Sequence, residues 1–396
     1  MRNSEISESI VRAWRRCRQS LAKFGPLTGA TLVLVPAAAW ADALPTPAMV
    51  GPLTSNPNPI SFDVGPFGNI YVGGVLSGFG LAQNSTYPGD HGTRWDFSNA
   101  QVVVQKASGL VQFYVQAGQY DILSLATPTV SSSYFTDHAF GLLAQAYIKL
   151  APSDNLSVEI GKLPTLIGDE DTFSFQNPQM ERGLLWDQTN AQTRGVQVNY
   201  AVGPVALNLS WNDGYYSDRF NSISGLLAWS INSADTLAFL GAGDAGKSAT
   251  STFITPLLQN NQQIYDLMYT HTEGPWMVQP YLQYSHVPTD PTIGIDSSSE
   301  TQSAAVLVNY NINPNWNLAG RVEYIGTSGG LNLLEGPGSR AWSVTITPTF
   351  QYKVFFVRGE ASYVGAGHTT PFETSLGANG TKTDQLRALI ETGVLF

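Results

Sequence analysis

The chain has 396 residues, of which 43% are hydrophobic and only 13% are charged, and its formal net charge is -10. Soluble proteins usually carry about 25% charged residues, so this composition disfavours an ordinary soluble surface. The negative charge argues against nucleic acid as a partner, because phosphate binding requires a positive field. Beyond the first forty residues no apolar run reaches the roughly 18 residues of a membrane helix, which excludes a helical membrane bundle.

The first 41 residues have the pattern of a secretory signal peptide. A basic region, Arg2–Lys23, precedes a short apolar stretch, Leu27–Val35, and then the small residues Ala39 and Ala41. Cleavage before Asp42 would leave 14 basic and 28 acidic residues, a net charge of -14. The only cysteine, Cys17, lies in the removed segment, so the mature chain would have no disulfide and no thiol chemistry.

Residues 42–67 form a second region that we expect to be a periplasmic N-terminal lead-in. Positions 42–60 are rich in Pro, Ala, Thr, Ser and Asn and show no periodicity, which is typical of a mobile segment. From about Gly68 apolar and polar residues alternate, which indicates strands with two different faces. The pattern predicts sixteen strands at 68–82, 95–106, 109–120, 139–151, 155–163, 193–201, 205–212, 223–231, 235–242, 262–272, 276–287, 301–311, 316–327, 341–351, 354–364 and 384–396.

The connections between these strands alternate in length. Every second connection is a short turn, such as Val202–Pro204 or Glu273–Pro275, and the others are long. Short turns on one side and long loops on the other are typical of bacterial outer-membrane barrels. In hydrocarbon every backbone group must be satisfied within the protein, so the sheet has to close. We therefore predict an all-β fold: a transmembrane antiparallel β-barrel over residues 68–396, with short periplasmic turns and long extracellular loops.

The alternation also predicts which face meets lipid. Over 316–327 the apolar side chains fall on one face and the polar ones on the other: Trp316, Leu318, Val322 and Tyr324 against Asn317, Arg321 and Glu323. Aromatic residues gather near strand ends, including Trp211, Trp276, Trp316, Trp342, Tyr200, Tyr284, Tyr310 and Tyr363. This placement suits aromatic girdles at two membrane interfaces; the alternative is a set of core aromatics in a soluble sheet.

Two features of the sequence resemble known outer-membrane proteins. The last strand ends in Phe396, which looks like the C-terminal signal read by the barrel-assembly machinery. The segments GKLPTLIGDED (161–171), NPQMERGLLWDQTNAQTRGVQVNY (177–200) and LNLSWNDGYYSDRF (207–220) resemble the OmpL-like β-barrel porin family and cover about a seventh of the mature chain. The resemblance implies an outer-membrane protein of a Gram-negative bacterium. Its expected partners are lipid, lipopolysaccharide, small hydrophilic solutes and, in a homo-oligomer such as a trimer, copies of itself.

A barrel of sixteen strands leaves an aqueous channel, and the third long loop, from Pro164 to Gln192, would narrow it as the same loop does in general porins. Arginines on the lumen faces of three strands could form a positive arc opposite acidic residues of this loop, with a transverse field across water. The alternative is that each Arg–Glu pair on a strand is a local ion pair. The predicted constriction residues are Asp169, Glu170, Asp171, Arg321, Glu323, Arg358, Glu360, Arg387 and Glu391.

No pattern indicates an enzyme, a cofactor or a metal site. The five histidines are scattered without metal-ligand spacing. Gly241–Ser248 matches the phosphate-loop pattern by its letters, but no helical period follows, so we interpret it as a flexible loop. Two functions stay open: a porin for passive diffusion of small hydrophilic solutes, or a non-conducting barrel for adhesion or envelope structure, plugged by the third loop and the lead-in.

Overall fold

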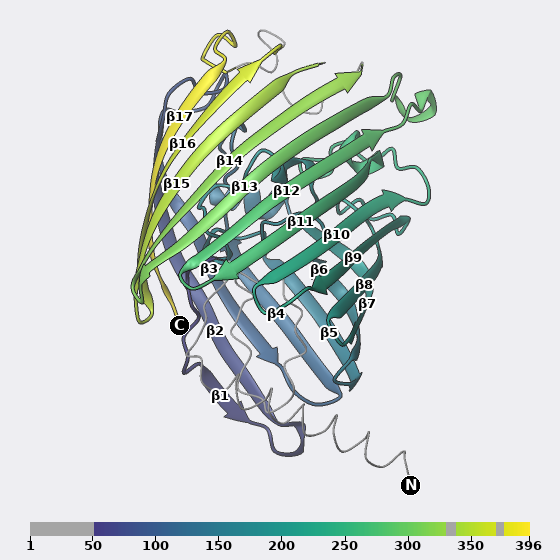
Figure 1. Cartoon of the computed structure of the whole chain (residues 1–396), viewed down its shortest axis with the longest axis vertical. Coiled ribbons are helices and arrows are strands. Elements are labelled where there is room, and N and C mark those ends of the chain that lie inside the picture. Colours follow the sequence, from purple (N-terminus) through teal and green to yellow (C-terminus); the bar gives the residue numbers. More distant parts are fainter. Residues whose placement is uncertain (1–50, 330–337, 370–375) are drawn as a thin grey trace.

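The computed structural model describes residues 51–329, 338–369 and 376–396, and within them sixteen antiparallel strands form one closed sheet (Figure 1). Each strand from β2 to β17 pairs with the next, and β17 pairs with β2. The signal peptide expected over 1–41 and the start of the lead-in lie outside the described residues. The barrel strands are β2 Asn69–Gln83, β3 Thr93–Lys106, β4 Val111–Tyr120, β5 Leu143–Ser153, β6 Leu156–Pro164, β7 Gln192–Val202, β8 Val205–Asn212, β9 Ser222–Ser230, β10 Asp235–Asp244, β11 Gln263–Glu273, β12 Trp276–Val287, β13 Ser299–Asn313, β14 Trp316–Gly329, β15 Arg340–Tyr352, β16 Phe355–Gly367 and β17 Asp384–Leu395.

All sixteen predicted strands are confirmed, with ends that differ by a few residues. The largest difference is at the strand expected over 139–151, which begins only at Leu143. The reason is a short helix, α2 (Ser132–His138), whose N-terminus is capped by the Ser131 side chain accepting from the Tyr134 N–H. A further short strand, β1 (Ile60–Asp63), was not predicted; it pairs with the first residues of β2.

The connections confirm the alternation in length. Those at 107–110, 154–155, 203–204, 231–234, 274–275, 314–315 and 353–354 are two to four residues long. The connections at the other end are longer, notably 121–142, 165–191 and 245–262. We call the two ends of the barrel the short-turn end and the long-loop end.

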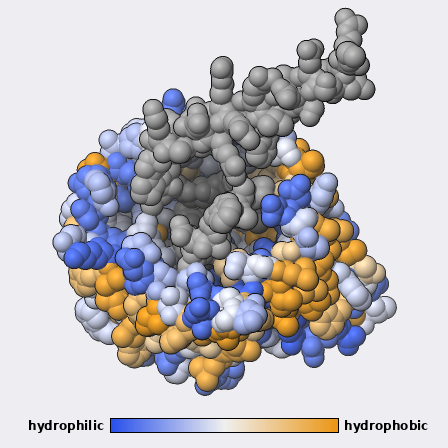
Figure 2. Space-filling model, turned by 90° about the horizontal axis from the view of Figure 1, so that it is seen from below, coloured by the Kyte–Doolittle hydropathy of each residue, from blue (hydrophilic) through white to orange (hydrophobic). Residues whose placement is uncertain are grey.

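The two faces of the wall differ as the alternation predicts. On β12 the outward Leu282 is 55% exposed, whereas the inward Gln283 is 4% exposed. Rings pair on the outer face, with Trp276 and Tyr310 centroids 4.3 Å apart. Figure 2 shows hydrophobic residues gathered on the outside of the barrel. Among the described residues no helix is long and apolar enough to cross a membrane.

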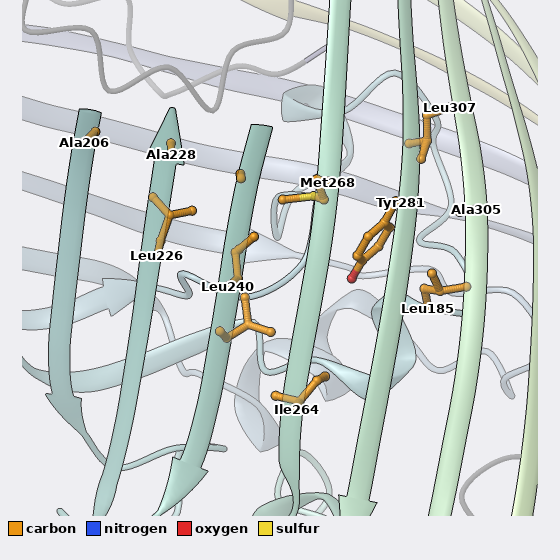
Figure 3. Packing of buried hydrophobic residues seen from close by; sticks show 12 residues of the cluster. Leu185, Ala206, Leu226, Ala228, Leu240, Ile264, Met268, Tyr281, Ala305 and Leu307 are labelled. Atoms are coloured by element: carbon orange, nitrogen blue, oxygen red, sulfur yellow. The ribbon is translucent and has the colours of Figure 1, made fainter. Parts of the chain in front are cut away.

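The inside of the wall is not uniformly polar. The lumen faces of β8 to β13 carry an apolar cluster, part of which Figure 3 shows as a row of side chains on neighbouring strands. We call this surface the apolar wall; it comprises Ala206, Leu226, Ala228, Ala238, Leu240, Ile264, Met268, Tyr281, Ala305 and Leu307. The inward charges lie mainly on β14, β16 and β17, and this surface is the clamp wall, defined by Arg321, Glu323, Arg358, Glu360, Arg387 and Glu391.

Candidate functional site

The third long connection, residues 165–191, lies inside the barrel, and we call it the inner loop. On one side the Gly168 N–H donates to Asp266 Oδ2 on β11 at 2.9 Å. On another side Asn99 on β3 donates to Ser174 Oγ at 2.9 Å. Its hydrogen bonds reach lumen-facing side chains of β3, β11, β12, β14, β16 and β17. The inner loop therefore crosses the lumen.

The first arginine of the clamp wall holds the start of the inner loop. Arg321 Nη1 on β14 lies 2.5 Å from Glu170 Oε1 and Arg321 Nε lies 3.2 Å from Glu323 Oε2. Glu170 also accepts from the Gly183 N–H at 2.8 Å. A Cβ at Gly183 would lie 2.2 Å from Glu323 Oε1, so any side chain at this position would displace the Glu323 carboxylate.

The second arginine holds the middle of the inner loop. Arg358 Nη2 on β16 lies 2.6 Å from Glu391 Oε2 on β17. Its guanidinium also donates to the carbonyls of Asn177 and Ser174, each at 2.9 Å. Glu391 in turn accepts from Ser174 Oγ at 2.8 Å. One buried ion pair of the wall therefore binds both the backbone and a side chain of the loop.

The third arginine joins the inner loop to another loop. Arg387 Nη1 on β17 lies 2.7 Å from Glu181 Oε1 and also donates to the Ser124 carbonyl at 2.6 Å. Ser124 belongs to the connection 121–142 at the long-loop end. Glu360 on β16 accepts from the Met180 and Glu181 N–H groups, at 2.5 and 2.9 Å. The turn around Glu181 is thus held through its side chain and its backbone.

These contacts bring the expected charged residues together. They do not arrange them as the hypothesis predicted, with a positive arc facing acidic loop residues across water. Arg321, Arg358 and Arg387 form an arc on one wall, and each side chain is at most 1% exposed. They touch carboxylates instead of facing them across water. The local alternative describes only Arg321 and Glu323, because Arg358 pairs across strands and Glu360 binds loop backbone. Buried charges persist only when paired and hydrogen-bonded, which these are.

The two remaining predicted residues lie at the start of the inner loop. Asp169 accepts a hydrogen bond from Gln279 Nε2 on β12. Asp171 contributes its backbone: its carbonyl accepts from Arg182 Nη1 at 2.8 Å. Arg182 also donates to the carbonyls of Gln179 and Met180, so the only basic residue of the loop folds the loop on itself. The sequence pattern places Arg182 in the loop and the other three arginines on strands, but it does not indicate that Arg182 binds carbonyls of its own loop.

On the opposite side the inner loop makes apolar contacts. Ile167 and Leu185, at most 1% exposed, belong to the same cluster as the apolar wall (Figure 3). The loop is therefore held by directional ion pairs on the clamp wall and by non-directional packing on the apolar wall.

A short N-terminal segment lies between the inner loop and the short-turn end. The Gly51 N–H donates to the Gln176 carbonyl at 2.8 Å. Thr54 and Gln351 exchange hydrogen bonds, with Thr54 N to Gln351 Oε1 at 2.8 Å and Gln351 Nε2 to the Thr54 carbonyl at 2.7 Å. Leu53 is 1% exposed. This part of the lead-in is fixed to the inside of the barrel.

The other motifs of the sequence take part in no comparable site. No group of three or more His, Cys, Asp or Glu in the described part of the chain is placed to hold a metal. The phosphate-loop pattern, Gly241–Ser248, spans the end of β10 and the start of a loop. The next helical element along the chain is a single 3-10 turn, Gln259–Asn261, so a phosphate would meet no α-helix N-terminus there.

The chain is similar to known proteins in sequence and in fold. Residues 69–396 match the sequence family described as "Putative beta-barrel porin-2, OmpL-like". Among solved structures, OmpT of Vibrio cholerae is similar with a TM-score of 0.56 and 10% identity, over 86% of this chain and 100% of that one. An anion-selective porin from Comamonas acidovorans has a TM-score of 0.55 and 11% identity, over 83% and 99%. The outer membrane channel DcaP of Acinetobacter baumannii has a TM-score of 0.55 and 11% identity, over 83% and 97%.

At these identities the structural likeness shows the fold, and the family match covers the whole barrel. No curated protein matches the chain. The chain belongs to the OmpL-like β-barrel porin-2 family and is an outer-membrane channel protein.

Proposed function

We propose that this porin lets small hydrophilic solutes diffuse passively through a lumen whose narrowest level is the inner loop, 165–191. The observation that carries the proposal is that hydrogen bonds tie this loop to six strands around the lumen. A barrel of sixteen strands is wide enough for water, so a loop fixed across it sets the size of what passes. The constriction then consists of the predicted residues of the loop and the clamp wall.

The charges at this level favour cations. Four arginines, Arg182, Arg321, Arg358 and Arg387, are outnumbered by the carboxylates of Asp169, Glu170, Asp171, Glu181, Glu323, Glu360 and Glu391. These groups are buried in ion pairs and hydrogen bonds, so they act on a passing ion through the field of their net negative charge, which attracts cations. We expect the reversal potential in a potassium chloride gradient to show a mild preference for potassium; a preference for chloride would contradict this part of the proposal.

We infer the orientation of the barrel in the membrane and its assembly from the same family. We assign the short-turn end to the periplasm and the long-loop end to the outside, after export by a signal peptide over 1–41 and insertion by the barrel-assembly machinery through Phe396. Lipid and lipopolysaccharide would surround the outer face. One structural neighbour, OmpT of Vibrio cholerae, is described in a trimer form, which supports a trimer here. The family and its neighbours support a role without catalysis.

One observation favours the alternative of a plugged, non-conducting barrel. Gly51–Thr54 occupies lumen space on the short-turn side of the inner loop. Liposome swelling separates the two functions. The diffusion proposal predicts that liposomes containing the purified barrel swell in arabinose at a rate that falls with increasing sugar size. Liposomes that do not swell, while the barrel is folded by its gel mobility with and without heating, would contradict it.

A further inference from the structure

A cavity lies at the long-loop end, between the inner loop and two other loops, and we call it the outer cavity. Its volume is about 280 Å³, and residues of the connections 121–142, 165–191 and 245–262 line it together with Gln192 and Tyr215. Cross-loop hydrogen bonds fix these walls: Gln259 Nε2 donates to the Asp187 carbonyl at 2.8 Å, and the Leu125 N–H donates to the Arg182 carbonyl at 3.0 Å. Hydrogen bonds between loops therefore hold the walls of the cavity in place at the long-loop end of the barrel.

Aromatic rings form a large part of this cavity. Phe135 and Phe253, from two different loops, meet edge to face with centroids 5.5 Å apart. Phe140, Trp186 and Tyr215 complete the aromatic lining. Ring faces attract both apolar groups and cations, so a flat organic group would find contacts on several sides.

The cavity also carries two carboxylates and, among its lining residues, no basic side chain. Asp121 and Asp187 both line it. Asp121 is 3% exposed, and within the described residues its Oδ2 has no hydrogen-bond partner. Arg94 acts electrostatically on Asp121, but its guanidinium is already paired with Asp96 at 2.9 Å. An unpaired buried carboxylate oxygen costs free energy. A positively charged hydrogen-bond donor inside the cavity would therefore be favourable.

We propose that this cavity binds an organic cation with a flat apolar body before the solute reaches the inner loop. Asp121 and Asp187 would neutralise the cationic head, and the rings of Phe135, Trp186 and Phe253 would contact the body. The volume is near the lower end of small-molecule sites, about 300 Å³, which fits a single-ring amine better than an oligosaccharide. The inference rests on the proposed channel function and names a class of solute for it.

The experiment uses the purified full barrel in detergent micelles and in planar bilayers. The probe is 2-phenylethylammonium, with phenylacetate as the anion of similar shape and 2-phenylethanol as the neutral analogue. Calorimetric titration in micelles measures binding, and block of the potassium current in bilayers measures entry into the channel. The variants are Asp121→Asn, Asp187→Asn and their combination. Asp137→Asn is the matched control, because Asp137 is exposed on the same loop and does not line the cavity.

The proposal predicts that the cation binds and blocks current while both analogues bind at least tenfold more weakly. The double variant should lose tenfold or more of the affinity, with Asp137→Asn unchanged. Phe253→Ala should weaken binding without altering the preference for the cation. Equal binding of phenylacetate, or equal affinity in the double variant, would overturn the inference. A barrel that conducts potassium but never binds the cation overturns the inference and leaves the channel function standing. A barrel that binds the cation but passes no potassium current would contradict the channel function and support the binding site.

Discussion

The clamp wall and the apolar wall hold the same loop by different physics. On the clamp wall three buried arginines bind Glu170, Glu181 and loop carbonyls at distances of 2.5–2.9 Å. On the apolar wall Ile167 and Leu185 pack against aliphatic side chains without any fixed direction. Ion pairs set a unique position, whereas apolar packing fills volume and tolerates exchange. The clamp wall therefore determines where the inner loop lies, and the apolar wall determines how tightly the remaining space closes.

The largest effect should come from breaking one ion pair of the clamp wall. Arg358→Met leaves the buried carboxylate of Glu391 without its partner, which costs about 3–5 kcal/mol of unfolding free energy. The double variant Arg358→Met/Glu391→Leu should recover part of that loss, because no unpaired charge remains. Chemical denaturation of the refolded barrel in micelles measures both.

The control for this variant is Arg219→Met, because Arg219 is exposed on the loop between β8 and β9. It should leave the unfolding free energy unchanged. If Arg358→Met were as stable as the parent chain, Arg358 would not be a structural anchor of the inner loop.

A smaller effect is expected on the apolar wall. Leu185→Ala removes a side chain that is 1% exposed, and burying a leucine contributes about 2–3 kcal/mol of unfolding free energy at the low end of measured core truncations. The same denaturation assay applies, with Leu110→Ala as the control because Leu110 is 60% exposed. A loss equal to that of Arg358→Met would remove the proposed difference between the two walls.

A change with pH should alter ligand binding at the outer cavity. Burial raises the pKa of Asp121 to about 7, against the opposing effect of Arg94, with Asp96 adding to the rise. Below pH 7 the carboxyl is protonated and neutral, so affinity for 2-phenylethylammonium should fall about tenfold from pH 8 to pH 6. Asp187 lines the same cavity, and burial raises its pKa as well. The titration is therefore repeated in Asp187→Asn, where Asp121 is the one titrating carboxyl group left among the lining residues. A flat profile there would show that Asp121 does not contact the cation.

The smallest stability effect is expected at the N-terminal segment, with a clearer effect on conductance. Leu53→Ser should release Gly51–Thr54 and raise single-channel conductance, with little change in the unfolding free energy of the barrel, because this segment can detach without unfolding any strand. Leu53→Met keeps the apolar contact and should behave like the parent chain. Unchanged conductance in Leu53→Ser would indicate that this segment does not obstruct the passage.

Much of the fold could be predicted from the sequence, because the alternation of apolar and polar residues within one strand shows which side chains face lipid and which face the lumen. The alternation of Leu282 and Gln283 needs no knowledge of the neighbouring strands. The short strand β1 and the helix α2 depend on partners distant in sequence or on a single cap, which periodicity does not report. The burial of Leu53 depends in the same way on contacts with the far end of the chain.

The candidate site was only partly predictable. The strand pattern placed Arg321, Arg358 and Arg387 on the lumen face, because their position depends on local alternation. Their pairing depends on how a loop of 27 residues, 165–191, folds inside the barrel. A loop has no periodic pattern, so its sequence does not show which strand residues it contacts. For the same reason the role of Gly183 beside Glu323 and that of Arg182 within the loop became visible only in three dimensions.

The central claim is that the clamp wall fixes the inner loop across the conducting path. Single-channel recording of Arg321→Ser/Arg358→Ser/Arg387→Ser in planar bilayers tests it most directly, after gel mobility has established that the variant is folded. We expect a larger conductance and an altered reversal potential, because the loop is released and the net charge at this level becomes more negative. Conductance and ion selectivity identical to those of the parent porin would contradict it.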